Sequence, residues 1–178
     1  MAEAFNETVL PAAKAQRYAA VAEEIAAVLD GEADLVARMA TVTSMLAHSF
    51  DHYFWTGFYV VDPAKGDELV VGPYQGSLGC MRIAFGRGVC GTAAALRTTQ
   101  VVDDVHAFPG HIACDARSAS EMVVPVFDEA GRLIAVFDVD SEAKAAFDGT
   151  DREWLERILN ATFARAKPVA LSYVGAPE

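Results

Sequence analysis

Apolar residues recur every three or four positions in three segments of the chain, as they do on the buried face of an amphipathic helix. The first segment covers residues 14–31 and the second follows at once, with Gly31 placed to end the first helix. The third lies near the other end, where Thr150 and Asp151 are candidates for its N-terminal cap. The residues predicted to face the core are Tyr18, Val21, Ile25, Val28 and Leu29 in the first helix, Leu35, Met39, Val42, Met45 and Leu46 in the second, and Trp154, Leu155, Ile158, Leu159 and Phe163 in the third.

Five segments between these helices are rich in Val, Phe, Tyr and Thr, as β-strands are. They cover residues 54–62, 67–74, 98–104, 121–128 and 132–140. The last two are separated by Asp128-Glu129-Ala130-Gly131, which is typical of a short hairpin loop. The short connections predict an α+β fold with a mostly antiparallel central sheet flanked by helices. Residues 103–120 show no periodicity, and a loop of this length in a small domain is usually functional or disordered.

Composition and charge narrow the class of protein. A chain of 178 residues with 53% hydrophobic residues predicts a single domain over residues 1–178. The 14 basic and 25 acidic residues give a formal net charge of -11, which argues against nucleic acid and anionic membranes as partners. The first twenty residues do not have the pattern of a secretion signal, and the chain has no run of about 18 apolar residues. We therefore expect a protein that is neither secreted nor membrane-spanning.

The sequence GRGVCG at residues 86–91 matches the GxGxxG pattern of dinucleotide-binding folds. That fold also needs a long helix and an acidic residue about 20 positions further on, whereas residues 92–97 leave room for only a short helix. We interpret the glycines as a tight turn into a short helix.

The three cysteines, Cys80, Cys90 and Cys114, are an odd number without a CxxC pair. This favours a reducing compartment such as the cytoplasm, where a disulfide is transient and catalytic. Their spacing does not fit a structural zinc site, even if His106 and His111 are counted as ligands. The alternative is three buried, reduced cysteines.

Local electrostatics distinguishes Cys90 from Cys114. Cys90 lies where the short helix should begin, and a helix N-terminus stabilises a thiolate. Cys114 stands beside Asp115, which would raise the pKa of its thiol, with Arg117 as a counterweight. Local electrostatics alone therefore favours Cys90 as the reactive thiol.

The last predicted strand changes from apolar to acidic along one face. Alternation places Ile134, Val136, Asp138 and Asp140 on that face and Leu133, Ala135, Phe137 and Val139 on the other. Glu121 begins the partner strand and lies within reach of the two aspartates. Such a group of acids favours a metal ion or a ligand ammonium group. The alternative is that the aspartates lead out to solvent and cap the turn at Ser141.

Trp55 and Tyr59 share one face of the first predicted strand, with Gly57 between them. A tryptophan wall beside acids suits a small cation that carries an apolar or sulfur-containing group. The alternative role of these aromatic residues is core packing.

Seven motifs, in this order, closely resemble those of the free methionine-(R)-sulfoxide reductases, which are single-domain enzymes of the GAF fold. The motifs are WTGFY, GPYQG, Cys80, GRGVCG, DVHAFPGHIACD, SEMVVP and FDVDS, and the resemblance runs from about Tyr18 to Phe163. The resemblance implies that Cys114 is the catalytic cysteine, that Cys80 is the resolving cysteine and that Cys90 is a third cysteine able to pair with Cys114. This contradicts the local electrostatic ranking, and we follow the resemblance because a substrate pocket can alter the pKa of a thiol.

The resemblance also implies a substrate site and a reaction. Glu121, Asp138 and Asp140 resemble the family's substrate-binding acids, with Glu121 also a candidate catalytic acid, and Trp55 and Tyr59 would flank the methyl end of the sulfoxide. The family reduces free methionine sulfoxide through a cysteine sulfenic acid and a disulfide, which thioredoxin and NADPH recycle without a bound cofactor or metal. Alternative functions are a GAF-type sensor of a small ligand and a thiol redox sensor. The first two predicted helices could form the interface of a homodimer, and the sequence does not decide whether they do.

Overall fold

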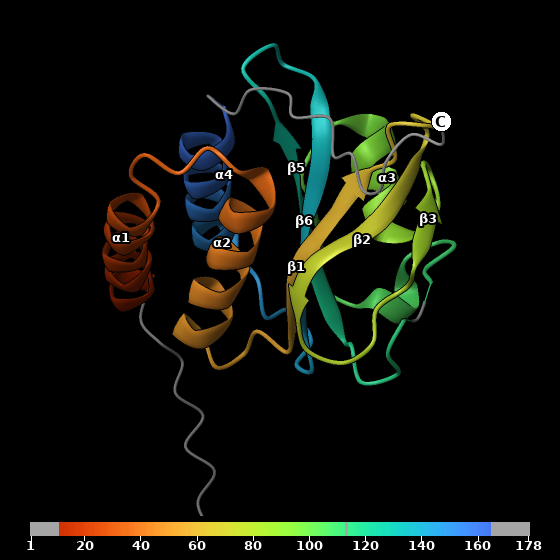
Figure 1. Ribbon diagram of the computed structural model, residues 1–178. Helices are drawn as coiled ribbons and strands as arrows, with labels where there is room; N and C mark the ends of the chain where they lie inside the picture. Colours follow the sequence, from red (N-terminus) through yellow and green to blue (C-terminus); the bar gives the residue numbers. More distant parts are fainter. Residues whose placement is uncertain (1–10, 113, 165–178) are drawn as a thin grey trace, which may run out of the picture.

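The computed structural model describes residues 11–112 and 114–164. Figure 1 shows a sheet between helices, and this sheet has six strands. The helices are α1 (Pro11–Val28), α2 (Leu35–Ser49), α3 (Gly88–Leu96) and α4 (Gly149–Phe163), with a 3-10 turn at Val105–Ala107. The strands are β1 (Trp55–Val61), β2 (Glu68–Gln75), β3 (Arg82–Ala84), β4 (Gln100–Val102), β5 (Ser120–Phe127) and β6 (Leu133–Ser141).

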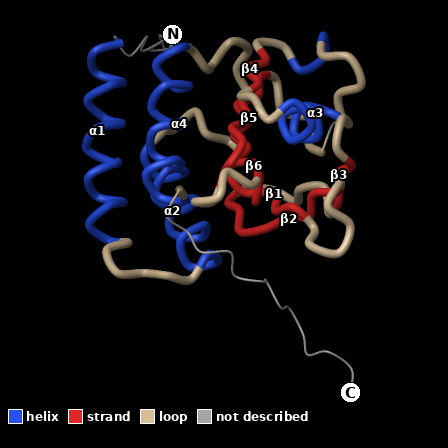
Figure 2. Tube along the Cα trace, turned by 90° about the horizontal axis from the view of Figure 1, so that it is seen from above, coloured by secondary structure: helices blue, strands red, loops and turns tan. Residues whose placement is uncertain are grey.

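The sheet has the strand order β3-β2-β1-β6-β5-β4, and all neighbouring strands are antiparallel. Figure 2 shows α2 and α4 on one face with α1 outside them, and α3 on the opposite face. This arrangement confirms the predicted α+β fold. None of the described helices is both long and apolar enough to cross a membrane.

The larger hydrophobic core lies between the sheet and α1, α2 and α4. The predicted helical stripes supply most of it, but Val28 is 62% exposed and its prediction as a core residue is wrong. Val28 is the last residue of α1, and its buried neighbour Leu29 points about 100° away around the helix axis. A buried network fixes α1 to α4: the Tyr18 hydroxyl donates to Asp151 at 2.8 Å, and Lys14 Nζ donates to the same carboxylate at 2.6 Å.

One helix cap and one short strand differ from the sequence prediction. The N-cap of α4 is Asp148, whose side chain accepts from the backbone N–H groups of Thr150 and Asp151. Asp151 completes a capping box by accepting from the Asp148 N–H, so it takes part in the cap without being the N-cap residue. β3 was not predicted, because three residues are too short to show a period-2 pattern.

A bulge in β6 exchanges the faces of its first two residues. Val126 pairs with Ala135, whereas Phe127 pairs with Leu133, so Ile134 is the extra residue. Leu133 packs on the α3 side and Ile134 on the opposite side, the reverse of the strict alternation predicted. From Ala135 onward the alternation holds, which places Val136 and Asp138 on the α3 side.

Candidate active site

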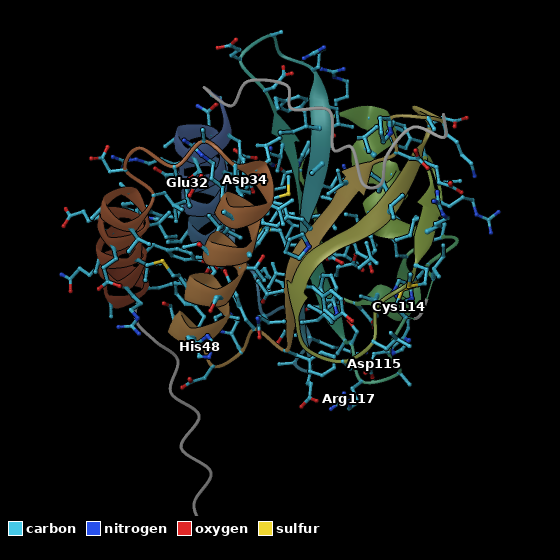
Figure 3. All side chains as sticks on the ribbon, in the orientation of Figure 1. Glu32, Asp34, His48, Cys114, Asp115 and Arg117 are labelled. Atoms are coloured by element: carbon cyan, nitrogen blue, oxygen red, sulfur yellow. A yellow bond between two sulfur atoms is a disulfide. The ribbon has the colours of Figure 1, made fainter. Side chains whose placement is uncertain are left out.

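A pocket lies on the α3 side of the sheet, where β1, β5 and β6 meet the start of α3 and the loop at residues 103–119. Seven predicted site residues line it: Trp55, Tyr59, Cys90, Cys114, Glu121, Asp138 and Asp140. The eighth, Cys80, is bonded to Cys114. In Figure 3, Cys114, Asp115 and Arg117 lie together on the side of the molecule away from Glu32 and Asp34.

The strand register brings the acids and the tryptophan into one row. Asp140 on β6 pairs with Trp55 on β1 and with Glu121 on β5, so these three residues stand side by side across the sheet. In the next row, Asp138 pairs with Gly57 and Val123. Glu121 and Asp138 are only 6% and 5% exposed, so the alternative that the strand leads its aspartates out to solvent does not hold for Asp138.

The three carboxyl groups resist ionisation in the absence of a ligand. Burial raises the pKa of Glu121 and that of Asp138 well above their ordinary values, and each is raised further by its acidic neighbours. Burial raises the pKa of Asp140 to about 6, against a hydrogen bond from Ser118 Oγ that favours the ionised form. Burying several acids without partners is unfavourable, and a bound cation would offset this by pairing with their ionised forms. The site therefore favours a cationic ligand group.

Among the described residues, no Lys or Arg side chain forms an ion pair with these three acids. Asp138 Oδ1 is buried and accepts no hydrogen bond from the described residues. Within the same part of the chain, the one basic side chain within 4 Å of these carboxylates is His111, whose Nε2 is 3.8 Å from Glu121 Oε2. Burial lowers the pKa of His111, which favours its neutral form. A ligand ammonium group would supply both the missing donor and the missing charge.

Trp55 and Tyr59 form an aromatic wall beside the acids. Their rings stack with centroids 5.5 Å apart, and the Tyr74 ring also stacks on Trp55 with centroids 5.3 Å apart. The Trp55 ring lies over Gly57, where an added Cβ would come within 2.9 Å of it. Trp55 Nε1 donates to the Ser77 carbonyl at 3.0 Å, which fixes the plane of the ring. The wall therefore serves both core packing and the pocket.

A disulfide joins Cys80 and Cys114, with a Cα–Cα distance of 5.5 Å across 34 positions of sequence. Cys80 follows the loop after β2, and Cys114 lies in the long loop before β5. Cys114 is exposed, whereas Cys80 is half-buried against the core on the α3 side. The pair that the family resemblance implies is thus the pair that is bonded.

Cys90 is a buried free thiol in the first turn of α3. GRGVCG forms the expected tight turn into a short helix, with Gly86 and Gly88 at positive φ. The expectation of a stabilised thiolate at Cys90 is wrong: burial, followed by the charges of Asp138 and Glu121, raises the pKa of its thiol well above the ordinary value. These effects outweigh the helix N-terminus because the thiol is only 4% exposed.

The residues that could hold a metal ion also differ from the zinc set considered from sequence. Cys80 and Cys114 are bonded to each other, and His106 is exposed. Cys90, Glu121 and Asp138 have ligand atoms within 4.8 Å of one another, the one such group of three found among the described residues. Several divalent metals accept two carboxylates and a thiol as ligands. The same three residues also line the pocket, where the two carboxylates could instead bind a ligand ammonium group.

Sequence reasoning missed three pocket features. Ser118 donates to Asp140, Ser77 Oγ donates to Asp115 Oδ2 at 2.7 Å, and the Arg117 guanidinium lies 4.3 Å from the centre of the Phe54 ring. His111 was considered only as a zinc ligand, yet it lines the pocket beside Glu121. These partners are distant in sequence or lie in the segment without periodicity, so no local pattern signals them.

Comparisons with known proteins identify the family to which the chain belongs. Residues 32–162 match the family model described as GAF domain. "GAF domain-containing protein A" from Dictyostelium discoideum is 44% identical over 82% of this chain and 90% of its own length. The free methionine-R-sulfoxide reductase of Saccharomyces cerevisiae is 40% identical over 72% of this chain and 74% of its own length.

A solved structure supports the same relationship. The free methionine-R-sulfoxide reductase of Neisseria meningitidis, determined in complex with its substrate, superposes with a TM-score of 0.78 at 49% identity. The match covers 84% of this chain and 90% of that structure. With its GAF fold, its Cys80–Cys114 disulfide and these relatives, the chain belongs to the free methionine-R-sulfoxide reductase family of GAF-domain proteins.

Proposed function

We propose that this protein reduces free methionine-(R)-sulfoxide to methionine. The observation that carries the proposal is the position of the Cys80–Cys114 disulfide at a pocket lined by three buried acids and an aromatic wall. The reaction and the choice of the R epimer are inferred from the family. Recognition of a small zwitterion with a polar sulfur group is inferred from the side chains that line the pocket.

Recognition of the substrate rests on its charge. The α-ammonium group would occupy the seat formed by Glu121, Asp138 and Asp140, where it supplies donors to the free oxygen of Asp138. Trp55 and Tyr59 would contact the methyl end of the sulfoxide. A methionine sulfoxide inside a polypeptide has an amide in place of the ammonium group, so the seat also accounts for selection of the free amino acid.

The chemical step transfers the sulfoxide oxygen to Cys114. Its thiolate attacks the sulfoxide sulfur, the departing oxygen takes a proton, and methionine leaves while Cys114 becomes a sulfenic acid. The sulfoxide gains two electrons and the cysteine loses two. Glu121 is suited to deliver the proton, because its raised pKa keeps a proton on a carboxyl group inside the pocket.

Two thiol reactions complete the cycle. The thiol of Cys80 displaces water from the Cys114 sulfenic acid, which forms the observed disulfide. Reduced thioredoxin then donates two electrons by thiol–disulfide exchange and restores both thiols. We place this cycle in the cytoplasm, where NADPH keeps thioredoxin reduced.

The test is NADPH consumption in an assay coupled to thioredoxin and thioredoxin reductase. Free L-methionine-(R)-sulfoxide should be consumed, whereas its S epimer and a peptide containing methionine sulfoxide should not. The variant Cys114→Ser should abolish turnover. A folded, reduced sample that forms no methionine from any of the three compounds would refute the proposal and leave a sensor of a small ligand or of thiol oxidation.

A further inference from the structure

Two exposed apolar side chains stand on either side of Cys80. Leu78 is 75% exposed and Met81 is 65% exposed. Five large apolar residues are exposed in the described part of the chain, and the other three are scattered over α1, α3 and β4: Val28, Leu96 and Val101. Single exposed apolar residues are ordinary, but two within two positions of a redox cysteine form a pair at a chemically reactive place.

The disulfide itself is accessible at this place. Cys114 is exposed and Cys80 is half-buried, so an attacking thiolate can approach from the surface that Leu78 and Met81 flank. Leu78 also lines the pocket together with Cys114, which shows that this apolar surface reaches the Cys114 side of the bond. An apolar surface beside an electrophilic sulfur suits a protein that carries a nucleophilic thiol within an apolar contact area.

Local charges do not oppose such a partner. Although the chain has a formal net charge of -11, the Arg82 guanidinium next to Met81 pairs with Asp62 and Glu68 at 2.7 and 2.6 Å. Arg117 pairs with Asp115 near the other cysteine. Arg82 and Arg117, which lie two and three positions after Cys80 and Cys114, are therefore each paired with acids of this chain, so docking here rests on apolar contact rather than on charge.

We propose that Leu78 and Met81 form the docking surface for a protein dithiol that reduces the Cys80–Cys114 disulfide. One thiolate of the partner attacks a sulfur of this bond, forming a mixed disulfide and releasing the other cysteine as a thiolate. The partner's second thiolate then attacks the mixed disulfide, so the partner loses two electrons and both cysteines regain their thiols. This docking surface rests on the proposed reductase function in one respect, namely that the Cys80–Cys114 disulfide is an intermediate of the catalytic cycle.

The test omits methionine sulfoxide, so it does not depend on the reductase activity. Oxidised protein is mixed with reduced thioredoxin, and the appearance of free thiols on this chain gives the rate constant of disulfide reduction. Met81→Ser should lower this rate constant by about fivefold to tenfold, because the polar side chain removes the contribution of Met81 to the apolar area buried on docking. The same variant should react with dithiothreitol at the wild-type rate, since a small dithiol needs no docking surface.

Two matched variants separate docking from general effects. Met81→Leu keeps the apolar area and should behave as the wild type with thioredoxin. Val28→Ser removes an apolar side chain of similar exposure on α1 and should also leave both rates unchanged. Circular dichroism and the unfolding temperature establish that each variant is folded.

Three results would overturn the docking surface. These are a wild-type rate of Met81→Ser with thioredoxin, an equal loss of rate with dithiothreitol, and a wild-type disulfide that dithiothreitol reduces but thioredoxin does not. Failure of the proposed function gives a different result, in which the wild type forms no methionine from the sulfoxide even with dithiothreitol as reductant.

Discussion

The hydroxyl of Ser77 donates a 2.7 Å hydrogen bond to Asp115 Oδ2, which joins the loop before Cys80 to the loop that carries Cys114. Arg117 also donates to Asp115 through its backbone N–H and its guanidinium group. The hydrogen bond from the Arg117 side chain, then that from Ser77 and then that from the Arg117 backbone N–H hold the pKa of Asp115 well below its ordinary value, so its carboxylate stays ionised at neutral pH. Because this contact is separate from the disulfide, it can keep the two loops together after the cysteines are reduced.

We expect Ser77→Ala to slow formation of the disulfide from the Cys114 sulfenic acid. Loss of the hydrogen bond lets the loops separate, which lowers the effective concentration of Cys80 near Cys114, and the rate should fall by about tenfold. Trapping of the sulfenic acid with a dimedone-type reagent should therefore increase, while the first equivalent of methionine forms at the wild-type rate. Ser77→Thr keeps the hydroxyl and serves as the control. Equal sulfenic acid lifetimes in Ser77→Ala and the wild type would contradict this role.

Substrate binding should weaken as the pH falls through about 6. Asp140 has its pKa raised to about 6 and must be ionised to pair with the α-ammonium group, so protonation removes the attraction. The KM for free methionine sulfoxide should rise by about tenfold per pH unit below that value. Glu121, Asp138 and Asp115 are the other acids that face or influence this group. Asp140→Asn should raise the KM at pH 7 and make it independent of pH between 5 and 7. An unchanged kcat/KM in this variant would show that the ammonium seat is wrongly assigned.

The same group should destabilise the ligand-free protein as the pH rises. The pKa of Asp140 is higher in the native state than its ordinary value of 3.8, so between pH 4 and 6 the native state binds more protons than the unfolded state. The contribution of Asp140 to stability is therefore complete below about pH 4 and lost as the pH rises through 6. Urea titrations of the wild type and Asp140→Asn should show a steeper fall of the unfolding free energy in the wild type over this range. Parallel curves would contradict the assignment.

Much of the fold was predictable because its signals are local and periodic. The stripes of α1, α2 and α4 follow the 3.6-residue repeat, and the loop at Asp128–Gly131 has Gly131 at the positive φ that such a turn requires. The errors arise where one residue decides the outcome. A single extra residue at Ile134 reverses two side chains, and the capping residue Asp148 lies two positions before Thr150, the first of the two cap candidates.

The site was only partly predictable, since linear neighbours do not reveal burial. Asp138 and Asp140 were found because two acids on an otherwise apolar strand are conspicuous. The state of Cys90 could not be deduced, because its helix N-terminus is visible in the sequence whereas the approach of Asp138 and Glu121 depends on strand pairing. Ser77 and Ser118 act across 38 and 22 positions and leave no local signal.

The number of turnovers that each cysteine variant completes should distinguish the role of Cys80 from that of Cys90. Cys80→Ser should release one equivalent of methionine per chain and then stall, because Cys114 remains a sulfenic acid without its partner. Cys90→Ser should continue to turn over, since the buried Cys90 thiol has a raised pKa and is not needed for the observed disulfide. Methionine released per chain, first without reductant and then with the thioredoxin system, measures both outcomes. Sustained release by Cys80→Ser with thioredoxin, lost in the double variant with Cys90→Ser, would instead show that Cys90 can replace Cys80.

Gly57 should be required for the aromatic wall of the pocket. A Cβ at this position would lie 2.3 Å from Tyr74 Cβ and 2.9 Å from the Trp55 ring, and neither the strand pairing nor the stacked rings leave room for it. Gly57→Ala should therefore lower the free energy of unfolding by about 1–3 kcal/mol and raise the KM for methionine sulfoxide as Trp55 is displaced. Gly149→Ala is the matched control, because an added Cβ there meets no atom within 4 Å. Equal unfolding temperatures and equal KM values in the two variants would show that the space over Gly57 does not position the tryptophan.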